Sequence, residues 1–140
     1  AAMVNPRHLI LRVNFFGPTQ VPWRQSFSDW VLMSLTDGST PMFFNDLLFN
    51  PLHMETLSAV ILEAVDMDLV GTYNVGASTS MSKAEFAVKV GQHMKVLTGQ
   101  TAIGPSDYRV PRPKDLRMDI SKLEEKGFKM PTLEQEIKRL

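Results

Sequence analysis

The sequence contains no cysteine, which excludes disulfide bonds and thiolate metal sites. Neither charge is in excess, because 15 Lys and Arg residues balance 15 Asp and Glu residues. A chain without net charge has no general attraction for nucleic acid or anionic membranes. Apolar runs such as residues 30–33 are far shorter than a membrane span. These absences favour a soluble domain, which we expect in the cytoplasm and without a nucleic-acid or membrane partner.

The glycines lack the spacing of the common phosphate-binding loops. No two of the eight glycines are separated by a single residue, so the Gly-x-Gly-x-x-Gly turn that holds a dinucleotide is missing. Gly71 and Gly76 have P-loop spacing, but Ala77 and Ser78 follow where Lys and Ser or Thr are required. A Gly-x-Ser-x-Gly elbow is absent, and the three histidines are not paired at metal-binding spacing. We therefore predict no catalytic, cofactor-binding or metal-binding residue.

The hydrophobic pattern predicts strands that alternate with helices. Apolar residues at 8–13 predict a buried strand of a parallel sheet, and residues 71–76 predict a second strand. Shorter strands are expected at 40–44 and 47–49. Apolar residues at helical spacing predict helices at about 27–36, 54–65, 83–98, 121–126 and 133–140. This alternation is typical of an α/β fold.

Capping residues support two of these helices. Ser82 with Glu85 and Thr132 with Gln135 form capping boxes, in which each side chain satisfies the other residue's backbone N–H. Ser26 or Ser28 is expected to cap the first helix, and Gly99 to end the third. On the second helix, we expect the buried face to comprise Met54, Leu57, Ile61, Ala64 and Val65.

Several polar groups allow more than one interpretation. The three arginines and one lysine of residues 108–117 could clamp a phosphate or diphosphate, or could keep an extended surface loop soluble. His53, at the start of a helix, could bond a nearby backbone group or line a pocket. The charged residues at 122–126 are expected to form a solvated helix face.

Segments along nearly the whole chain carry a family resemblance. In order, they are residues 9–18 (LILRVNFFGP), 49–57 (FNPLHMETL), 71–87 (GTYNVG followed by SKAEFA) and 112–131 (RPKD, DISKL, GF and MP). This succession resembles the second half of extended short-chain dehydrogenase/reductases, in particular dTDP-4-dehydrorhamnose reductases and nucleotide-sugar epimerases. The resemblance implies the C-terminal part of a Rossmann-like NAD(P)-binding α/β fold, with the N-terminal glycine-motif half absent. It implies one domain over residues 1–140, with the last part of the Rossmann sheet at 1–18 and a substrate lobe at 19–140.

The resemblance also implies substrate contacts. Asn14, at the carboxyl end of its strand, would face the sugar or diphosphate, although it could instead satisfy local backbone groups. Arg112 would bind the diphosphate, and His53 would lie near the mouth of the cleft. Trp23, in the loop 20–24, would help to enclose the nucleoside.

The chain departs from this family at the catalytic motif. Tyr73 is followed four residues later by Ala77, and Tyr108 by Arg112, so the Tyr-x-x-x-Lys pair that transfers a proton is missing. We therefore expect a substrate-binding fragment of an NAD(P)-dependent nucleotide-sugar reductase, epimerase or dehydratase that is inactive alone. NAD or NADP would serve the parent enzyme without binding tightly to this chain.

Two further expectations follow from the missing motifs. A non-catalytic regulatory or protein-interaction module derived from the same family is the alternative function. The strand at 8–13 would lack neighbours from the missing half, so we expect self-association through its exposed edge.

Overall fold

The computed structural model describes residues 4–21, 23–37, 39, 41–96, 102–107 and 113–140. Its helices are α1 (Phe27–Thr36), α2 (Met54–Asp66), α3 (Lys83–His93), α4 (Ser121–Glu124) and α5 (Leu133–Ile137). Its strands are β1 (Leu9–Val13), β2 (Phe15–Phe16), β3 (Met42–Phe44), β4 (Leu48–Phe49), β5 (Leu52–His53), β6 (Gly71–Val75), β7 (Met81–Ser82), β8 (Ala102–Gly104) and β9 (Asp115–Leu116). None of the helices in these ranges is both long and apolar enough to span a membrane.

Parallel pairing dominates the small sheets. β1 pairs with β6, β2 with β5, β3 with β8 and β4 with β9, all in parallel, whereas β4 and β7 are antiparallel. The predicted parallel strand near 8–13 is therefore confirmed, with Leu9 opposite Gly71 and Val13 opposite Val75. Its predicted burial is wrong, because residues 9–11 are only partly buried and residues 12–13 are exposed. In the described chain β1 has one neighbouring strand, which leaves its other edge uncovered.

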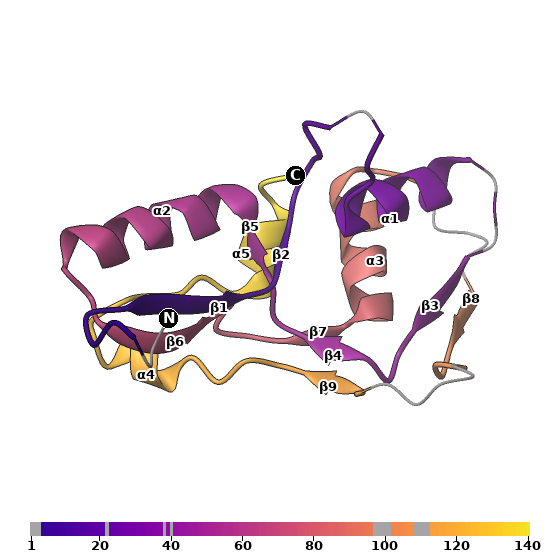
Figure 1. Cartoon of the computed structure of the whole chain (residues 1–140). Helices are drawn as coiled ribbons and strands as arrows, with labels where there is room; N and C mark the ends of the chain where they lie inside the picture. Colours follow the sequence, from indigo (N-terminus) through magenta and orange to yellow (C-terminus); the bar gives the residue numbers. More distant parts are fainter. Residues whose placement is uncertain (1–3, 22, 38, 40, 97–101, 108–112) are drawn as a thin grey trace.

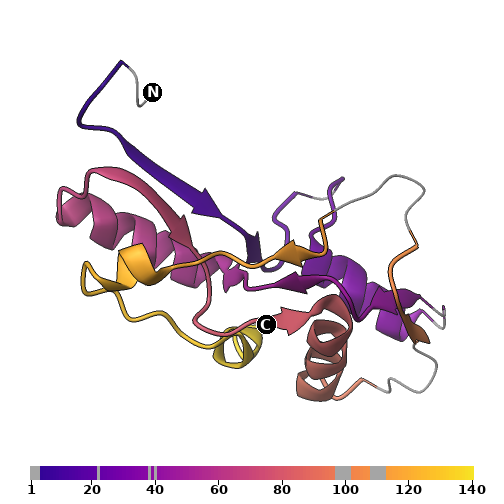
Figure 2. The ribbon, with the colours of Figure 1, turned by 90° about the horizontal axis from the view of Figure 1, so that it is seen from below.

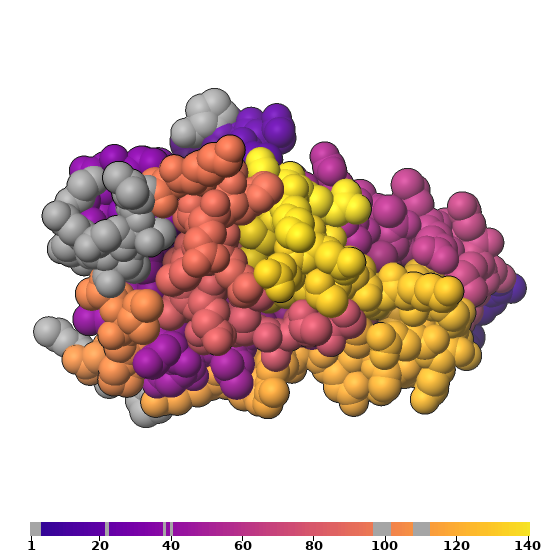
Figure 3. Space-filling model, turned by 180° about the vertical axis from the view of Figure 1, so that it is seen from behind, coloured from indigo at the N-terminus to yellow at the C-terminus, as the bar shows by residue number. Residues whose placement is uncertain are grey.

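The elements form an elongated molecule with α5 near its middle (Figure 1). α2 lies along the β1–β6 pair at one end, whereas α1, α3, β3 and β8 make up the other end. Seen from below, β9 runs beside β4 between the two ends (Figure 2). From behind, the C-terminal residues fill the surface between α3 and α2 (Figure 3). The division of the chain into parts at residue 18 stays a prediction.

Phenylalanine rings form the centre of the core. The ring of Phe86 is fully buried on α3, with centroids 5.0 Å from Phe16, 5.5 Å from Phe27 and 5.4 Å from Phe49. The Phe16 and Phe49 rings meet it edge to face, the arrangement that the quadrupole of an aromatic ring favours. This cluster joins α1 and α3 to β2 and β4.

The predicted helix starts are confirmed. Ser26, Ser82 and Thr132 each accept a hydrogen bond from the backbone N–H three residues later, and each start has a complete capping box. The predicted end of α3 is wrong: the helix ends at His93, and Gly99 lies outside the described residues. Lys95 has a φ of 56°, a left-handed conformation that cannot continue a right-handed helix.

The predicted face of α2 is also partly wrong. Leu57, Val60 and Ala64 are the buried residues, whereas Ile61 and Val65 are 40% and 61% exposed. The apolar residues of α2 therefore extend around the helix beyond the face that the described chain covers.

The short helix α4 is fastened to the sheet by a residue expected only to be solvated. Lys122 is exposed, but its Nζ donates a 2.8 Å hydrogen bond to the carbonyl of Thr72 and lies 4.6 Å from the ring centroid of Tyr73. The charged residues at 122–126 are exposed, as predicted, and Lys122 in addition holds α4 against β6.

Asn50 joins three segments that are distant in the sequence. Its Nδ2 donates to the carbonyls of Ala77 and Met118 at 2.9 and 3.0 Å, and its Oδ1 accepts from the Met118 N–H at 2.8 Å. A Cβ at Gly76 would lie 2.7 Å from the carbonyl oxygen of Asn50, so only glycine fits this crossing.

We predict that Asn50→Ala lowers the free energy of unfolding by about 2 kcal/mol, because it removes three bonds and strands a partly buried N–H. Urea denaturation measures the change. Asn45→Ala is the matched control, since Asn45 is exposed and its side chain makes no hydrogen bond within the described residues. Equal effects of the two substitutions would contradict the role given to Asn50.

Candidate functional site

A pocket of about 450 Å³ lies beside β2, beyond the carboxyl end of β1. Residues 15–21 and 24–27 form most of its wall, and Met54 of α2 completes it. We call it the β2 pocket. Ligands of α/β proteins bind at the carboxyl ends of parallel strands, and the β2 pocket has this position.

The loop that forms this pocket is held by α1. Ser28 Oγ accepts from the N–H of Gly17 at 3.1 Å and donates to its carbonyl at 3.0 Å. Asp29 accepts from the N–H of Thr19 at 3.1 Å. Burial acts to raise the pKa of Asp29, but hydrogen bonds from Ser26 and Thr19 outweigh it, so the pKa lies below its ordinary value. Gly17 has a φ of 145°, and a Cβ there would lie 2.9 Å from the side chain of Met54.

The pocket offers both charge and apolar surface to a ligand. Arg24 is exposed at its rim, and its guanidinium has no partner among the described residues. Phe15, although part of β2, is 55% exposed. A free guanidinium beside an open aromatic ring suits a ligand that carries both an anionic group and a ring.

His53 lies in the wall behind this pocket. It is buried at the N-cap of α2, and its Nδ1 accepts from the N–H of Glu55 at 3.3 Å, which confirms the predicted backbone bond. A neutral ring that accepts at Nδ1 carries its proton at Nε2. This Nε2 has no hydrogen-bond partner, and it lies 3.4 Å from where a Cβ of Gly17 would be. A buried, unpartnered donor therefore faces the glycine of the pocket wall.

Glu136 of α5 positions His53, and our sequence analysis did not single it out. The carboxylate is fully buried and accepts from the His53 N–H at 2.7 Å and from the Thr56 hydroxyl at 2.9 Å. Arg139 Nε donates to it at 3.2 Å. The sequence offered one signal for the burial of Glu136. It lies three positions after Leu133, and residues three apart lie on the same face of a helix.

The other predicted substrate residues are not gathered at the pocket. Asn14 lies between β1 and β2, where its carbonyl accepts from the N–H of Leu52 at 3.0 Å, and its side chain is bonded to no described residue. Trp23 follows the pocket loop but is 88% exposed and does not line the pocket. Arg112 lies outside the described residues. Neither His53 nor Trp23 lines the pocket, although His53 packs directly behind Gly17 of its wall.

The described cations of the basic segment 108–117 are paired with carboxylates. Lys114 Nζ lies 2.6 Å from a carboxylate oxygen of Asp46, and its hydrogen bond lowers the pKa of Asp46. Arg117 makes two bonds with Asp115, which lower the pKa of Asp115 to about 2. For these two cations, the interpretation as a surface loop is therefore favoured over a phosphate clamp.

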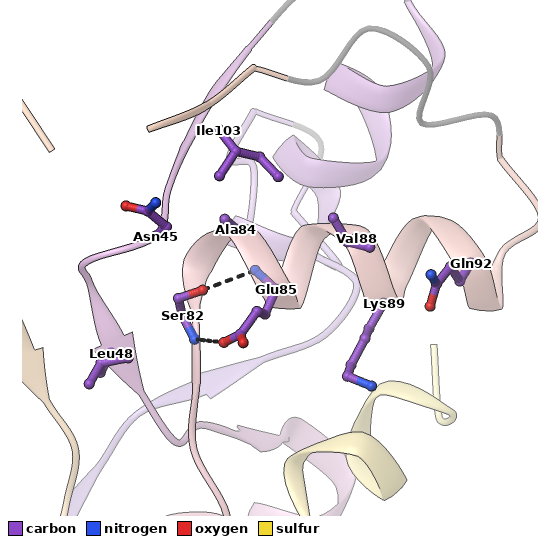
Figure 4. Close-up of a pocket in the computed structure, with 9 residues that line it drawn as sticks. All are labelled: Asn45, Leu48, Ser82, Ala84, Glu85, Val88, Lys89, Gln92 and Ile103. Atoms are coloured by element: carbon purple, nitrogen blue, oxygen red, sulfur yellow. Dashed lines mark hydrogen bonds between the residues drawn. The ribbon is translucent and has the colours of Figure 1, made fainter. Parts of the chain in front are cut away.

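A second pocket of about 440 Å³ lies beside α3 (Figure 4). Its charged groups are already bound: the Glu85 carboxylate accepts from the Ser82 N–H at 2.7 Å, and Lys89 reaches Glu134 of α5 at 3.0 Å. This pocket therefore lacks the free charge that Arg24 gives to the β2 pocket.

The starts of the three long helices do not fit a pyrophosphate. Asp29 caps α1 as the N3 residue of its box, Glu85 does the same for α3, and Glu136 occupies the start of α2. A carboxylate at a helix N-terminus takes the N–H groups and the favourable dipole that a phosphate would use. The starts of these three helices thus offer no cradle for a nicotinamide dinucleotide.

Solved structures of nucleotide-sugar enzymes share this fold. A dTDP-4-dehydrorhamnose reductase from Bacillus anthracis, solved with NADP, matches 94% of the chain with a TM-score of 0.82 and 21% identity. A reductase of the same name from Clostridium acetobutylicum matches 99% with a TM-score of 0.84 and 16% identity. A UDP-N-acetylglucosamine 4-epimerase from Methanobrevibacter ruminantium, solved with UDP-N-acetylmuramic acid, matches 93% with a TM-score of 0.73 and 18% identity.

These matches confirm the predicted α/β fold of extended short-chain dehydrogenase/reductases. The chain spans only about half of the length of those proteins, namely 47%, 49% and 43%. No protein-family model and no curated protein matches the sequence.

We predict that Glu136→Gln lowers the free energy of unfolding by about 2 kcal/mol, because an amide has one acceptor atom where the carboxylate has two. Glu134→Gln on the same helix is the control, since an ion pair as exposed as that of Glu134 with Lys89 adds little to stability. Urea unfolding of both variants measures the difference. A smaller effect for Glu136→Gln than for the control would contradict the assigned role.

Proposed function

We propose that this chain provides the nucleotide-sugar-binding half of an NAD(P)-dependent reductase, epimerase or dehydratase. The observation that carries the proposal is the β2 pocket, with the unpaired guanidinium of Arg24 at the carboxyl ends of β1 and β2. The fold shared with nucleotide-sugar enzymes supports the choice of ligand.

The residues at the pocket suit the parts of such a ligand. Arg24 pairs with the diphosphate, because guanidinium matches phosphate oxygens in two parallel hydrogen bonds. The exposed ring of Phe15 supplies an apolar face for a sugar or base. Apart from these residues of the pocket wall, the contacts of Asn14 with the sugar, Arg112 with the diphosphate and Trp23 with the nucleoside stay proposals from the family resemblance.

The cofactor belongs to the rest of the proposed enzyme. NAD or NADP would accept or supply the hydride there. This chain binds and orients the sugar nucleotide, and it is proposed to be inactive alone because Tyr-x-x-x-Lys is absent from its sequence.

We predict that dTDP-glucose shifts the amide NMR signals of residues 15–17, 19–21 and 24–27. We also predict that Arg24→Ala weakens binding about tenfold, the effect of one lost charge-assisted bond. Arg12→Ala, which removes the same charge from exposed β1 outside the pocket, should leave the dissociation constant unchanged. Equal weakening by both substitutions would indicate a general charge effect, and unshifted pocket signals would reject the site.

The reading frame of the gene separates the proposal from its alternative. An upstream Gly-x-Gly-x-x-Gly motif and Tyr-x-x-x-Lys would complete an oxidoreductase, which would then be assayed at full length. A frame without them favours a regulatory or interaction module.

We also propose that the isolated chain self-associates through β1. One edge of β1 is unpaired in the described structure, and Val13 on it is exposed. We predict dimers in sedimentation at micromolar concentration, and we predict that Val13→Lys weakens them because charge opposes edge pairing. Val4→Lys, at an exposed residue outside the strand, is the control. A monodisperse wild-type monomer would count against this proposal.

A further inference from the structure

A small aromatic pocket lies between α1, β3 and the first residue of α3. Its volume is about 200 Å³, and its lining residues are Phe27, Trp30, Met42, Phe43, Phe44 and Lys83. We call it the Lys83 pocket. Nothing in the β2 site uses Lys83, and Phe27 alone contributes to both pockets.

The amine of Lys83 rests on aromatic rings. Its Nζ lies 3.9 Å from the ring centroid of Phe27 and 4.9 Å from that of Phe49. The rings of Trp30 and Phe43 meet with centroids 5.3 Å apart, so the wall is aromatic as well. Ring faces attract a cation, but the attraction is weaker than that of a hydrogen-bonded carboxylate.

Lys83 has no anionic partner in the described part of the chain. Three other lysines there have an oxygen partner, in Glu134 for Lys89, Asp46 for Lys114 and the carbonyl of Thr72 for Lys122. The remaining described lysines are exposed to solvent, whereas Lys83 is partly buried. Burial lowers the pKa of Lys83, and no neighbouring charge opposes this effect. A partly desolvated cation without an anion retains unsatisfied donors.

We propose that the Lys83 pocket binds a small aromatic carboxylate. The carboxylate completes the ion pair with Lys83, and the ring of the ligand packs against Trp30 and Phe43. A cavity of about 150 Å³ already accommodates benzene, so the volume suffices for one ring with a carboxylate. The charged group among the lining residues is the amine of Lys83, so the pocket favours an anion over a neutral ligand of the same shape.

Benzoate and benzamide are the probes, because they share one shape and differ in charge. In NMR titrations of the wild-type chain, we expect benzoate to shift the Lys83 ζ and Trp30 indole signals and to bind about tenfold more tightly than benzamide. The signals of Gly17 and Thr19 in the β2 pocket should stay unchanged, so this result is independent of the nucleotide-sugar proposal. Equal binding of the two probes would overturn the proposal. So would unshifted signals at about 10 mM benzoate, roughly ten times a weak dissociation constant of about 1 mM.

A substitution series isolates the charge of Lys83. Lys83→Met replaces the amine by an unbranched apolar side chain, and the backbone N–H of residue 83 can still donate to Leu47. We expect this variant to lose the preference for benzoate over benzamide. Lys89→Met, on the same helix but outside the pocket, should keep it. Benzoate binding that persists unchanged in Lys83→Met would overturn the proposal.

Discussion

The buried carboxylate of Glu136 is the contact on which the arrangement around the β2 pocket depends. It ties the last helix of the chain to the first residues of α2, more than 70 positions earlier, through the His53 N–H and the Thr56 hydroxyl. His53 ends β5, whose partner β2 forms the pocket, so the C-terminal helix determines where the pocket wall lies. A charge buried this deeply is tolerated because several donors surround it.

Carboxylates of the chain also occupy the starts of the other long helices, and this determines which ligands the chain can take. Asp29 and Glu85 satisfy the starts of α1 and α3, so the positive ends of these helices are directed at the chain's own carboxylates. Recognition of an anion then falls to side-chain cations that the fold leaves unpaired. The unpaired cations of the described residues include Arg24 and Lys83, each of which lies at a pocket with aromatic walls. The two cations differ in setting, since Arg24 is exposed and Lys83 partly buried.

The sequence was most informative where local interactions decide the structure. Ser82 with Glu85 and Thr132 with Gln135 stabilise helix starts through neighbouring residues alone, so both starts were predictable. The strands β2, β5, β7 and β9 contain two residues each, too few to show a period, and distant partners create them. Ile61 and Val65 were expected in the core because they are apolar residues at helical spacing. Their burial depends, however, on what covers α2. His53, which lies behind the pocket wall, was singled out from its motif. Arg24 and Lys83 were not, because their unpaired state exists only in the folded chain.

Phe27 lines both proposed sites, and the contacts of its ring indicate that the two sites act independently. Its ring contacts those of Trp30, Phe49 and Phe86 with centroids 5.5 to 6.0 Å apart, and the amine of Lys83 lies on its face. A ring held by three others and by a cation has little freedom to move when a ligand arrives. Coupling between two sites requires an element with two arrangements of similar energy. We therefore expect Phe27 to separate the β2 pocket from the Lys83 pocket, so that a ligand in one leaves the shape of the other unchanged.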